Sequence, residues 1–146
     1  MLAGLINKYF QQNGDLLLAT KQALNRVKGT FGLVILSPKA PRQLIVARRG
    51  SPIVIGVDDS QNYVASDPSA IVAHTDKVIY LKDDQIALLQ DESVDVYDLK
   101  LNQQSVAPEK LESSAKPVSI EGYASFLEKE IHEQPQSLRN LMRGRI

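Results

Sequence analysis

The chain opens with two stretches whose apolar residues recur at helical spacing. In the first stretch they occupy positions i, i+3, i+4, i+7 and i+8, as one face of an amphipathic helix requires: Leu2, Leu5, Ile6, Tyr9 and Phe10. A turn at Asn13-Gly14 follows, and Asp15 is placed to cap a second helix. That second helix is predicted to end at Gly29.

The period then changes from helical to alternating, which is typical of strands. Four strands are predicted first, at residues 30–37, 43–49, 52–57 and 62–66. Asp67 is placed to cap a short helix of about two turns that begins with Pro68. Three more strands alternate around tight turns at Asp83-Asp84 and Asp91-Glu92 and predict an antiparallel meander: residues 77–82, 85–90 and 94–99.

The last third of the chain changes character. Residues 102–120 are rich in Gln, Ser, Pro, Lys and Glu and predict an extended linker. The helical run from Tyr123 to Glu133 is interrupted by Pro135, and a second short run is expected to close at Gly144. We therefore expect one folded unit over residues 1–101, followed by a linker and connector helix over 102–146 that leads toward a further domain.

Composition limits the classes of function. With 146 residues and 43% hydrophobic content, the chain can bury one ordinary core. Its 17 basic and 17 acidic residues cancel, which disfavours nucleic acid and anionic membranes as partners. The first apolar stretch is too short to span a membrane. The chain has no cysteine, so it lacks disulfides and thiol nucleophiles, and this agrees with a cytoplasmic location.

Three residues supply the types found in a hydrolytic triad, namely Ser66, His74 and Asp76. Their closeness in sequence is no evidence for the geometry that a triad requires. His74 is expected to cap carbonyl groups where the short helix ends, and His132 to be a solvated or interface side chain on the connector helix.

Two acidic pairs have residue types that can bind cations. Neither Asp58-Asp59 nor Asp83-Asp84 has further oxygen ligands at a recognisable spacing, so turn roles are predicted for both. The run from Arg48 to Pro52 has the residue types of a phosphate cradle. Pro52, however, removes one N–H donor and leads into a strand, which favours a structural corner. We predict positive φ or close packing at Gly50 and at most one buried arginine.

Several segments resemble the second half of the glutaminase domain of the glutamine–fructose-6-phosphate aminotransferase (isomerizing) family, the glucosamine-6-phosphate synthases. They are Ala47–Gly56, Ala65-Ser66-Asp67 with Ala70, Val78–Leu81, and Lys28–Gly32 at the exit of a helix. The most specific likeness is to the family's connector, in Lys129–Pro135 and Gly144-Arg145-Ile146. The resemblance covers nearly the whole chain, from Leu2 to Ile146.

The resemblance implies an α+β fold: part of an αββα sandwich of the N-terminal-nucleophile (Ntn) hydrolase kind, with mostly antiparallel sheets and a C-terminal linker and helix. The family's glutaminase uses an N-terminal cysteine, a glutamine-binding arginine and aspartate, and an Asn-Gly oxyanion pair. All of these would lie before Met1, and Asn13-Gly14 occupies a turn between helices. No catalytic, cofactor-binding or metal-binding residue is therefore assigned.

Two functions from different classes follow. The first is a non-catalytic fragment of the enzyme that makes glucosamine 6-phosphate from fructose 6-phosphate. The second is a stand-alone interaction or regulatory module that pairs with a full-length amidotransferase. An independent enzyme using Ser66, His74 or the arginine corner is a third reading.

The expected partners are a second copy of the chain or the missing half of the glutaminase domain. An incomplete sandwich exposes strand edges and apolar faces, which favours oligomers. The contact is expected to bury more than roughly 1,000 Å² in total. The surfaces expected to supply it are an edge strand, the connector helix from Tyr123 to Glu133, or the first helix face: Leu2, Leu5, Ile6 and Phe10.

Overall fold

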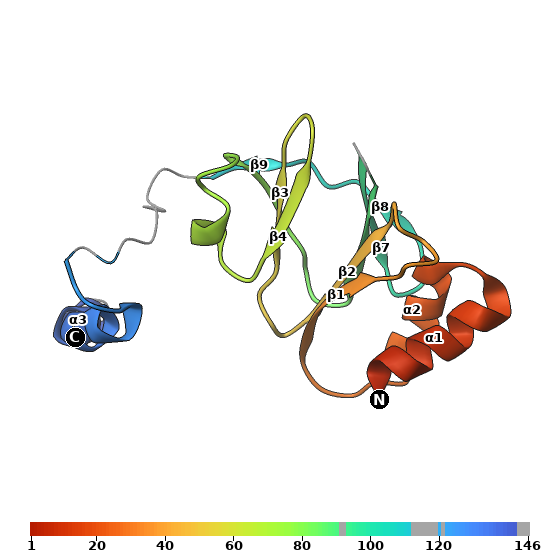
Figure 1. Ribbon diagram of the computed structural model, residues 1–146, viewed down its shortest axis with the longest axis horizontal. Coiled ribbons are helices and arrows are strands. Elements are labelled where there is room, and N and C mark those ends of the chain that lie inside the picture. Colours follow the sequence, from red (N-terminus) through yellow and green to blue (C-terminus); the bar gives the residue numbers. More distant parts are fainter. Residues whose placement is uncertain (91–92, 112–119, 121, 143–146) are drawn as a thin grey trace. The chain divides into compact units, whose positions relative to one another are not determined.

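The computed structural model describes residues 1–90, 93–111, 120 and 122–142. The chain forms two compact units, Met1–Lys116 and Pro117–Ile146 (Figure 1). The first unit contains two helices, a short 3₁₀ helix and nine strands among its described residues; the second contains one helix. Each unit is described by itself below.

The first unit begins with the two predicted helices, α1 (Leu2–Asn13) and α2 (Leu16–Leu24). Gly14 ends α1 in a left-handed conformation, and the Asp15 carboxylate accepts a hydrogen bond from Leu18 N at 3.0 Å, which confirms the predicted cap. The expected end of α2 at Gly29 is wrong. The chain leaves the helix after Leu24 through tighter turns, in which Val27 N donates to Leu24 O.

Nine strands follow, most of them where alternation predicts them. They are β1 (Phe31–Leu36), β2 (Leu44–Arg49), β3 (Val54–Val57), β4 (Asn62–Ala65), β5 (Lys77–Tyr80), β6 (Gln85–Gln90), β7 (Ser93–Asp98), β8 (Gln103–Gln104) and β9 (Glu109–Lys110). They form a five-stranded sheet in the order β1-β2-β6-β7-β8 and a four-stranded sheet in the order β4-β3-β5-β9. All strand pairs within these sheets are antiparallel.

The predicted three-strand meander is only partly correct. β6 and β7 pair as a hairpin, but β5 pairs with β3 and β9 in the other sheet. The Asp83-Asp84 segment is therefore a crossover between sheets and not a hairpin turn. The turn predicted at Asp91-Glu92 lies outside the described residues.

The predicted short helix is the 3₁₀ helix η1 (Pro68–Ala70), shorter than expected. Its Asp67 cap is confirmed, since Ser69 N donates to the Asp67 carboxylate at 2.8 Å. The expected linker also differs from the structure. The residues just after position 101 add β8 to one sheet and β9 to the other, so the first unit extends beyond the predicted linker start.

Alternation along the strands separates three hydrophobic layers. In β2, Ile45 and Ala47 pack against α1 and α2, while Val46 faces the other sheet. Ile55 and Ile79 meet Val46 in the layer between the sheets. On the outer face of the four-stranded sheet, Val54 and Val78 pack against Ile71 and Leu111. The order of layers is helices, five-stranded sheet, four-stranded sheet, and the covering segment around η1.

The second unit contains the helix α3 (Phe126–Met142). Ser125 Oγ accepts from Glu128 N at 3.2 Å and the Glu128 carboxylate accepts from Ala124 N at 2.8 Å, so the helix starts at Phe126 with reciprocal capping. The predicted break at Pro135 is wrong, because α3 runs through it. The predicted end at Gly144 lies outside the described residues.

Candidate functional site

The arginine corner lies where the chain passes from β2 into the four-stranded sheet. Gly50 has φ of 72°, and its N–H donates to the Asp83 carboxylate at 2.9 Å. A Cβ atom at Gly50 would lie 2.5 Å from Thr30 Cγ2. Both the positive φ and the close packing predicted at Gly50 are therefore confirmed.

Both arginines are held by groups of the same chain. Arg49 Nε lies 2.5 Å from an Asp84 carboxylate oxygen, Nη1 donates to Val27 O at 2.8 Å, and the guanidinium lies 4.8 Å from the centre of the Phe31 ring. Arg48 Nη1 donates to Leu81 O, and Nε lies 3.4 Å from the Asp83 carboxylate, outside hydrogen-bond alignment. Their side chains are 27% and 25% exposed for Arg48 and Arg49, so neither is buried.

The corner thus joins two segments that cross between the sheets, one from β2 to β3 and the other from β5 to β6. Besides the carboxylate contacts, Asp84 N donates to Arg48 O at 2.8 Å, which fixes the chain after β5 to the chain at the end of β2. A phosphate at this corner would have to displace both carboxylates from the arginines. The arrangement supports the structural reading of the corner.

The triad-type residues have separate partners. The His74 ring stacks on Tyr63 with centroids 4.7 Å apart. Within the part of the chain that the structure describes, no hydrogen bond joins this ring to a carbonyl group, so the expected capping contact is not formed. Asp76 pairs with Lys110 at 3.4 Å. None of the hydrogen bonds of the described residues joins Ser66, His74 or Asp76 to one another. This part of the chain therefore offers no triad geometry.

The remaining candidates have structural positions. Asp58 N donates to Gln61 O at 3.1 Å in the turn between β3 and β4, as predicted for a turn. His132 is exposed and stacks on Tyr123, with centroids 5.4 Å apart. Within residues 1–90, 93–111, 120 and 122–142, no group of three or more His, Asp or Glu side chains is placed to hold a metal ion.

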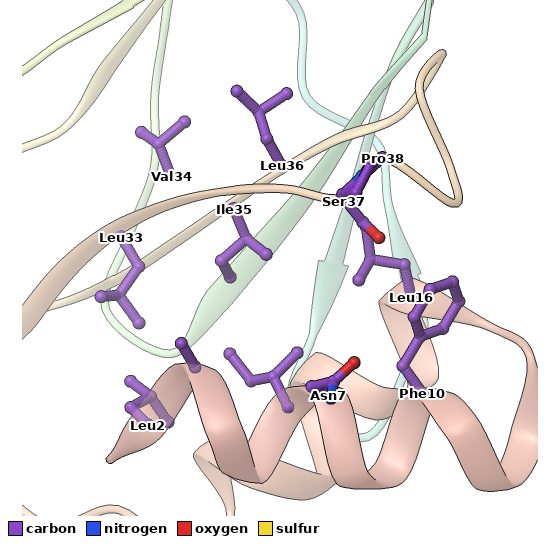
Figure 2. Close-up of a pocket in the computed structure, with 12 residues that line it drawn as sticks. Leu2, Asn7, Phe10, Leu16, Leu33, Val34, Ile35, Leu36, Ser37 and Pro38 are labelled. Carbon is purple, nitrogen blue, oxygen red and sulfur yellow. The ribbon is translucent and has the colours of Figure 1, made fainter.

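The structure instead reveals an open flank on the sandwich. A hollow of about 400 Å³ lies between α1 and β1 (Figure 2). In Figure 2, Leu33 and Ile35 of β1 point toward α1, whereas Val34 and Leu36 point to the other face of the strand. Apart from Asn7 and Ser37, its lining is apolar: Leu2, Ala3, Ile6, Phe10, Leu16, residues 33–36 and Pro38.

A second hollow lies on the same flank, between the two sheets. It measures about 390 Å³ and is lined by Gly32 and Val34 of β1, Ser51–Ile53, and Val64–Ser66 at the end of β4. β1 and β4 are the end strands of their sheets in the described part of the chain. The two hollows therefore flank the free edge of β1, one on each face.

The first helix face is not an exposed surface, contrary to expectation. Ile6 and Phe10 are 5% and 9% exposed because they pack into the chain's own core. In the second unit α3 exposes Phe126, Leu127, Ile131 and Leu138, and in the first unit Val34 and Leu36 of β1 are exposed apolar side chains, at 51% and 73%. The sequence carried a signal for this surface: β1 is apolar on both faces, a pattern typical of strands covered on both sides.

The fold defines the class of protein. The structure resembles glutamine phosphoribosylpyrophosphate amidotransferase from B. subtilis, with a TM-score of 0.52 and 24% identity over 70% of this chain and 22% of that one. This likeness, together with two antiparallel sheets covered by helices on one face, shows that the fold is part of a sandwich of the Ntn-hydrolase kind. The α+β prediction is confirmed.

Curated relatives that share one name match the chain over its whole length. The chain is 37% identical over 148 residues to glutamine–fructose-6-phosphate aminotransferase (isomerizing) of Chlorobaculum tepidum, and 38% identical over 151 residues to that of Idiomarina loihiensis. Each alignment covers 100% of this chain and 24% of the relative. The chain is thus similar over its whole length to one segment of these aminotransferases and spans about a quarter of their length. The chain matches no protein-family profile.

A further relative of the same name, from Pseudomonas aeruginosa, is 34% identical over 146 residues. None of the helices in the described residues has the length and apolar character needed to cross a membrane.

Proposed function

We propose that the chain forms the second half of the glutaminase domain in a glutamine–fructose-6-phosphate aminotransferase. In this role it supplies the framework of the sandwich: one helical layer and a part of each sheet. The observation that carries the proposal is the similarity of the entire chain to one segment of enzymes that bear this name. The fold likeness to a second glutamine amidotransferase supports it.

The reacting groups come from elsewhere in this proposal. Hydrolysis of the glutamine amide by a thiolate needs a cysteine, and this chain has none. The side chains of the arginine corner are occupied by contacts within the chain. The 146 residues by themselves are therefore proposed to be inactive, and glucosamine 6-phosphate synthesis belongs to the complete enzyme.

A segment exchange tests the proposal. The matched segment of the Chlorobaculum tepidum enzyme is replaced by this chain, and the chimera is assayed for ammonia release from glutamine and for glucosamine 6-phosphate. We expect both activities in the chimera, and neither with the 146-residue chain alone.

Two results would contradict the proposal. One is a soluble, folded chimera that releases no ammonia, which would leave the stand-alone interaction module as the remaining reading. The other is ammonia release by the repurified chain alone, above a control without protein. A chimera in which the parental segment is reinserted at the same junctions controls for damage by the junctions.

A further inference from the structure

The turn between α1 and α2 contains the one Asn-Gly pair of the sequence, Asn13 and Gly14. An asparagine that precedes glycine is prone to spontaneous deamidation, because the glycine nitrogen has no side chain beside it and can approach the asparagine side chain closely. Both residues are exposed, so water reaches them. The function proposed above makes no use of this pair.

The reaction is a hydrolysis in two steps that needs only water. In the first step the backbone nitrogen of Gly14 attacks Cγ of Asn13, so that an N–Cγ bond forms and the bond from Cγ to Nδ2 breaks. The side-chain nitrogen leaves as ammonia, with the proton that the Gly14 nitrogen gives up. In the second step water opens the cyclic imide at either carbonyl, which leaves aspartate or isoaspartate at position 13.

The folded chain holds both reacting groups in hydrogen bonds. The Gly14 N–H donates to Phe10 O at 2.8 Å and closes the last turn of α1. The Asn13 side chain is held at both of its polar atoms. Its Oδ1 accepts from Asp15 N at 2.9 Å, and its Nδ2 donates to Gln22 Oε1 at 3.3 Å. The attack therefore requires the end of α1 to open first.

From these contacts we infer that Asn13-Gly14 is a site of spontaneous deamidation, which folding keeps latent and which local opening of α1 exposes. α1 is held by Ile6 and Phe10, but the hollow of about 400 Å³ between α1 and β1 leaves part of its inner face without protein contacts (Figure 2). Elements with fewer buried apolar contacts open at a lower free energy than the rest of a fold. The inference is independent of the proposed function.

Modification weakens the turn that protects the site. A carboxylate at position 13 lies at the C-terminal end of α1, where the helix dipole disfavours negative charge, and it no longer donates to Gln22. Isoaspartate also adds a methylene group to the backbone, which displaces the Asp15 carboxylate from Leu18 N and removes the cap of α2. Because the change is irreversible, it accumulates with the time that α1 spends open.

The experiment incubates the full chain at mildly alkaline pH, folded in buffer and unfolded in denaturant, and follows each asparagine by peptide mass spectrometry. Since only the open state reacts, the observed rate equals the rate in the unfolded chain multiplied by the open fraction, as in hydrogen exchange. We expect Asn13 to react at least about tenfold more slowly in the folded chain than in denaturant.

Two matched variants locate the opening. Ile6→Val removes one methylene group from a side chain that is 5% exposed and holds α1, and we expect it to speed the reaction of Asn13 in the folded chain by about two- to tenfold. Ile79→Val makes the same change between the two sheets, where Ile79 is 3% exposed, and is expected to leave that rate unchanged. Circular dichroism checks that both variants fold.

Three results would overturn the inference: equal rates for Asn13 in the folded and the denatured chain, no reaction of Asn13 in denaturant, or an Ile6→Val variant that reacts no faster than Ile79→Val. None of them bears on the proposed function. Ammonia from Asn13 forms without glutamine and stops at one molecule per chain, whereas a glutaminase needs glutamine and turns over.

Discussion

Gly50 lies where the chain passes from β2 into the four-stranded sheet, with a positive φ and no room for a side chain. Replacement by alanine would strain the left-handed backbone, at a cost of about 1–2 kcal/mol, and would press a methyl group against Thr30, at a further cost of about 1–3 kcal/mol. We expect Gly50→Ala to lower the free energy of unfolding by the sum of both effects, measured by urea denaturation.

Gly14 provides the matched control. Its φ of 71° is almost that of Gly50, but a Cβ atom there meets nothing within 4 Å. Gly14→Ala should therefore show the backbone cost alone. Equal losses for the two variants would mean that the contact with Thr30 contributes nothing.

Two turn carboxylates make stability depend on acidic pH. Hydrogen bonds from Ser69 lower the pKa of Asp67, and hydrogen bonds from Asn102, reinforced by Lys100, lower the pKa of Asp98. A lowered pKa means that the folded state favours the charged form. The resulting stability is complete above the unfolded-state pKa of about 3.9 and is lost as the pH falls through the lowered value.

The check is urea denaturation at a series of pH values between about 6 and 2. We expect the unfolding midpoint to fall in the acidic range, with a smaller fall in Asp98→Asn. Asp59→Asn is the control, because that side chain is 97% exposed and its ion pair with Lys77 Nζ is long, at 3.9 Å. A pH dependence unchanged in Asp98→Asn would show that the Asp98 hydrogen bonds do not stabilise the fold.

The sequence predicted the structural roles of those residues whose hydrogen-bond partners are near in the chain or whose role is local. Asp15 and Asp67 cap helices two or three residues away, and Gly50 is a turn glycine, so local rules identify all three. Asp83 and Asp84 were expected to form a hairpin turn, yet their partners Gly50 and Arg49 lie 33 and 35 residues away. Local rules carry no information about contacts at such separation.

At the scale of elements, the arginine corner fastens one crossover to the other. We expect Arg49→Ala to lower the free energy of unfolding by about 1 kcal/mol, the upper range for a partly exposed ion pair, and inorganic phosphate to leave the melting temperature unchanged. Arg42→Ala, at an arginine outside the corner, is the comparison. Stabilisation by phosphate that disappears in Arg49→Ala would establish a ligand site and overturn the structural reading.

The helix α3 contains an internal proline, which removes the N–H that would bond to the carbonyl four residues earlier. Proline inside a helix costs about 3 kcal/mol relative to alanine. We expect Pro135→Ala to increase the helical circular dichroism signal of the chain and to raise the temperature at which α3 melts. Gln134→Ala serves as the neighbouring control. A loss of helical signal in Pro135→Ala would contradict a helix that runs through this position.

The elements also show why patterning predicts strands better than their pairing. Alternation located β5 and β6 within a residue or two, but an alternating strand fits either sheet of a sandwich. The short strands β8 and β9 were not predicted, because two residues are too few to show an alternating pattern. The continuation of α3 beyond Pro135 was also missed. The rule that proline ends a helix does not compare the cost of the proline with the stability of the rest of the helix.

At the scale of the whole molecule, the two flanks of the sandwich differ in how their strand edges are covered. Among the described residues, one flank is covered by the segment that carries β8 and β9, and the other ends at β1, an end strand with a hollow on each face. The resemblance of motifs implied an incomplete sandwich. It could not show which edge is open, because that follows from the order of strands in both sheets.

The central claim is that this chain works as one half of a glutaminase sandwich. Its most direct test is a titration of the chain into a fixed amount of the unmatched part of the Chlorobaculum tepidum glutaminase domain, with ammonia release from glutamine as the signal. We expect no release from either component alone, and activity that rises with added chain until the two are equimolar. Release by the chain alone, or none at any ratio although the two parts bind, would contradict it.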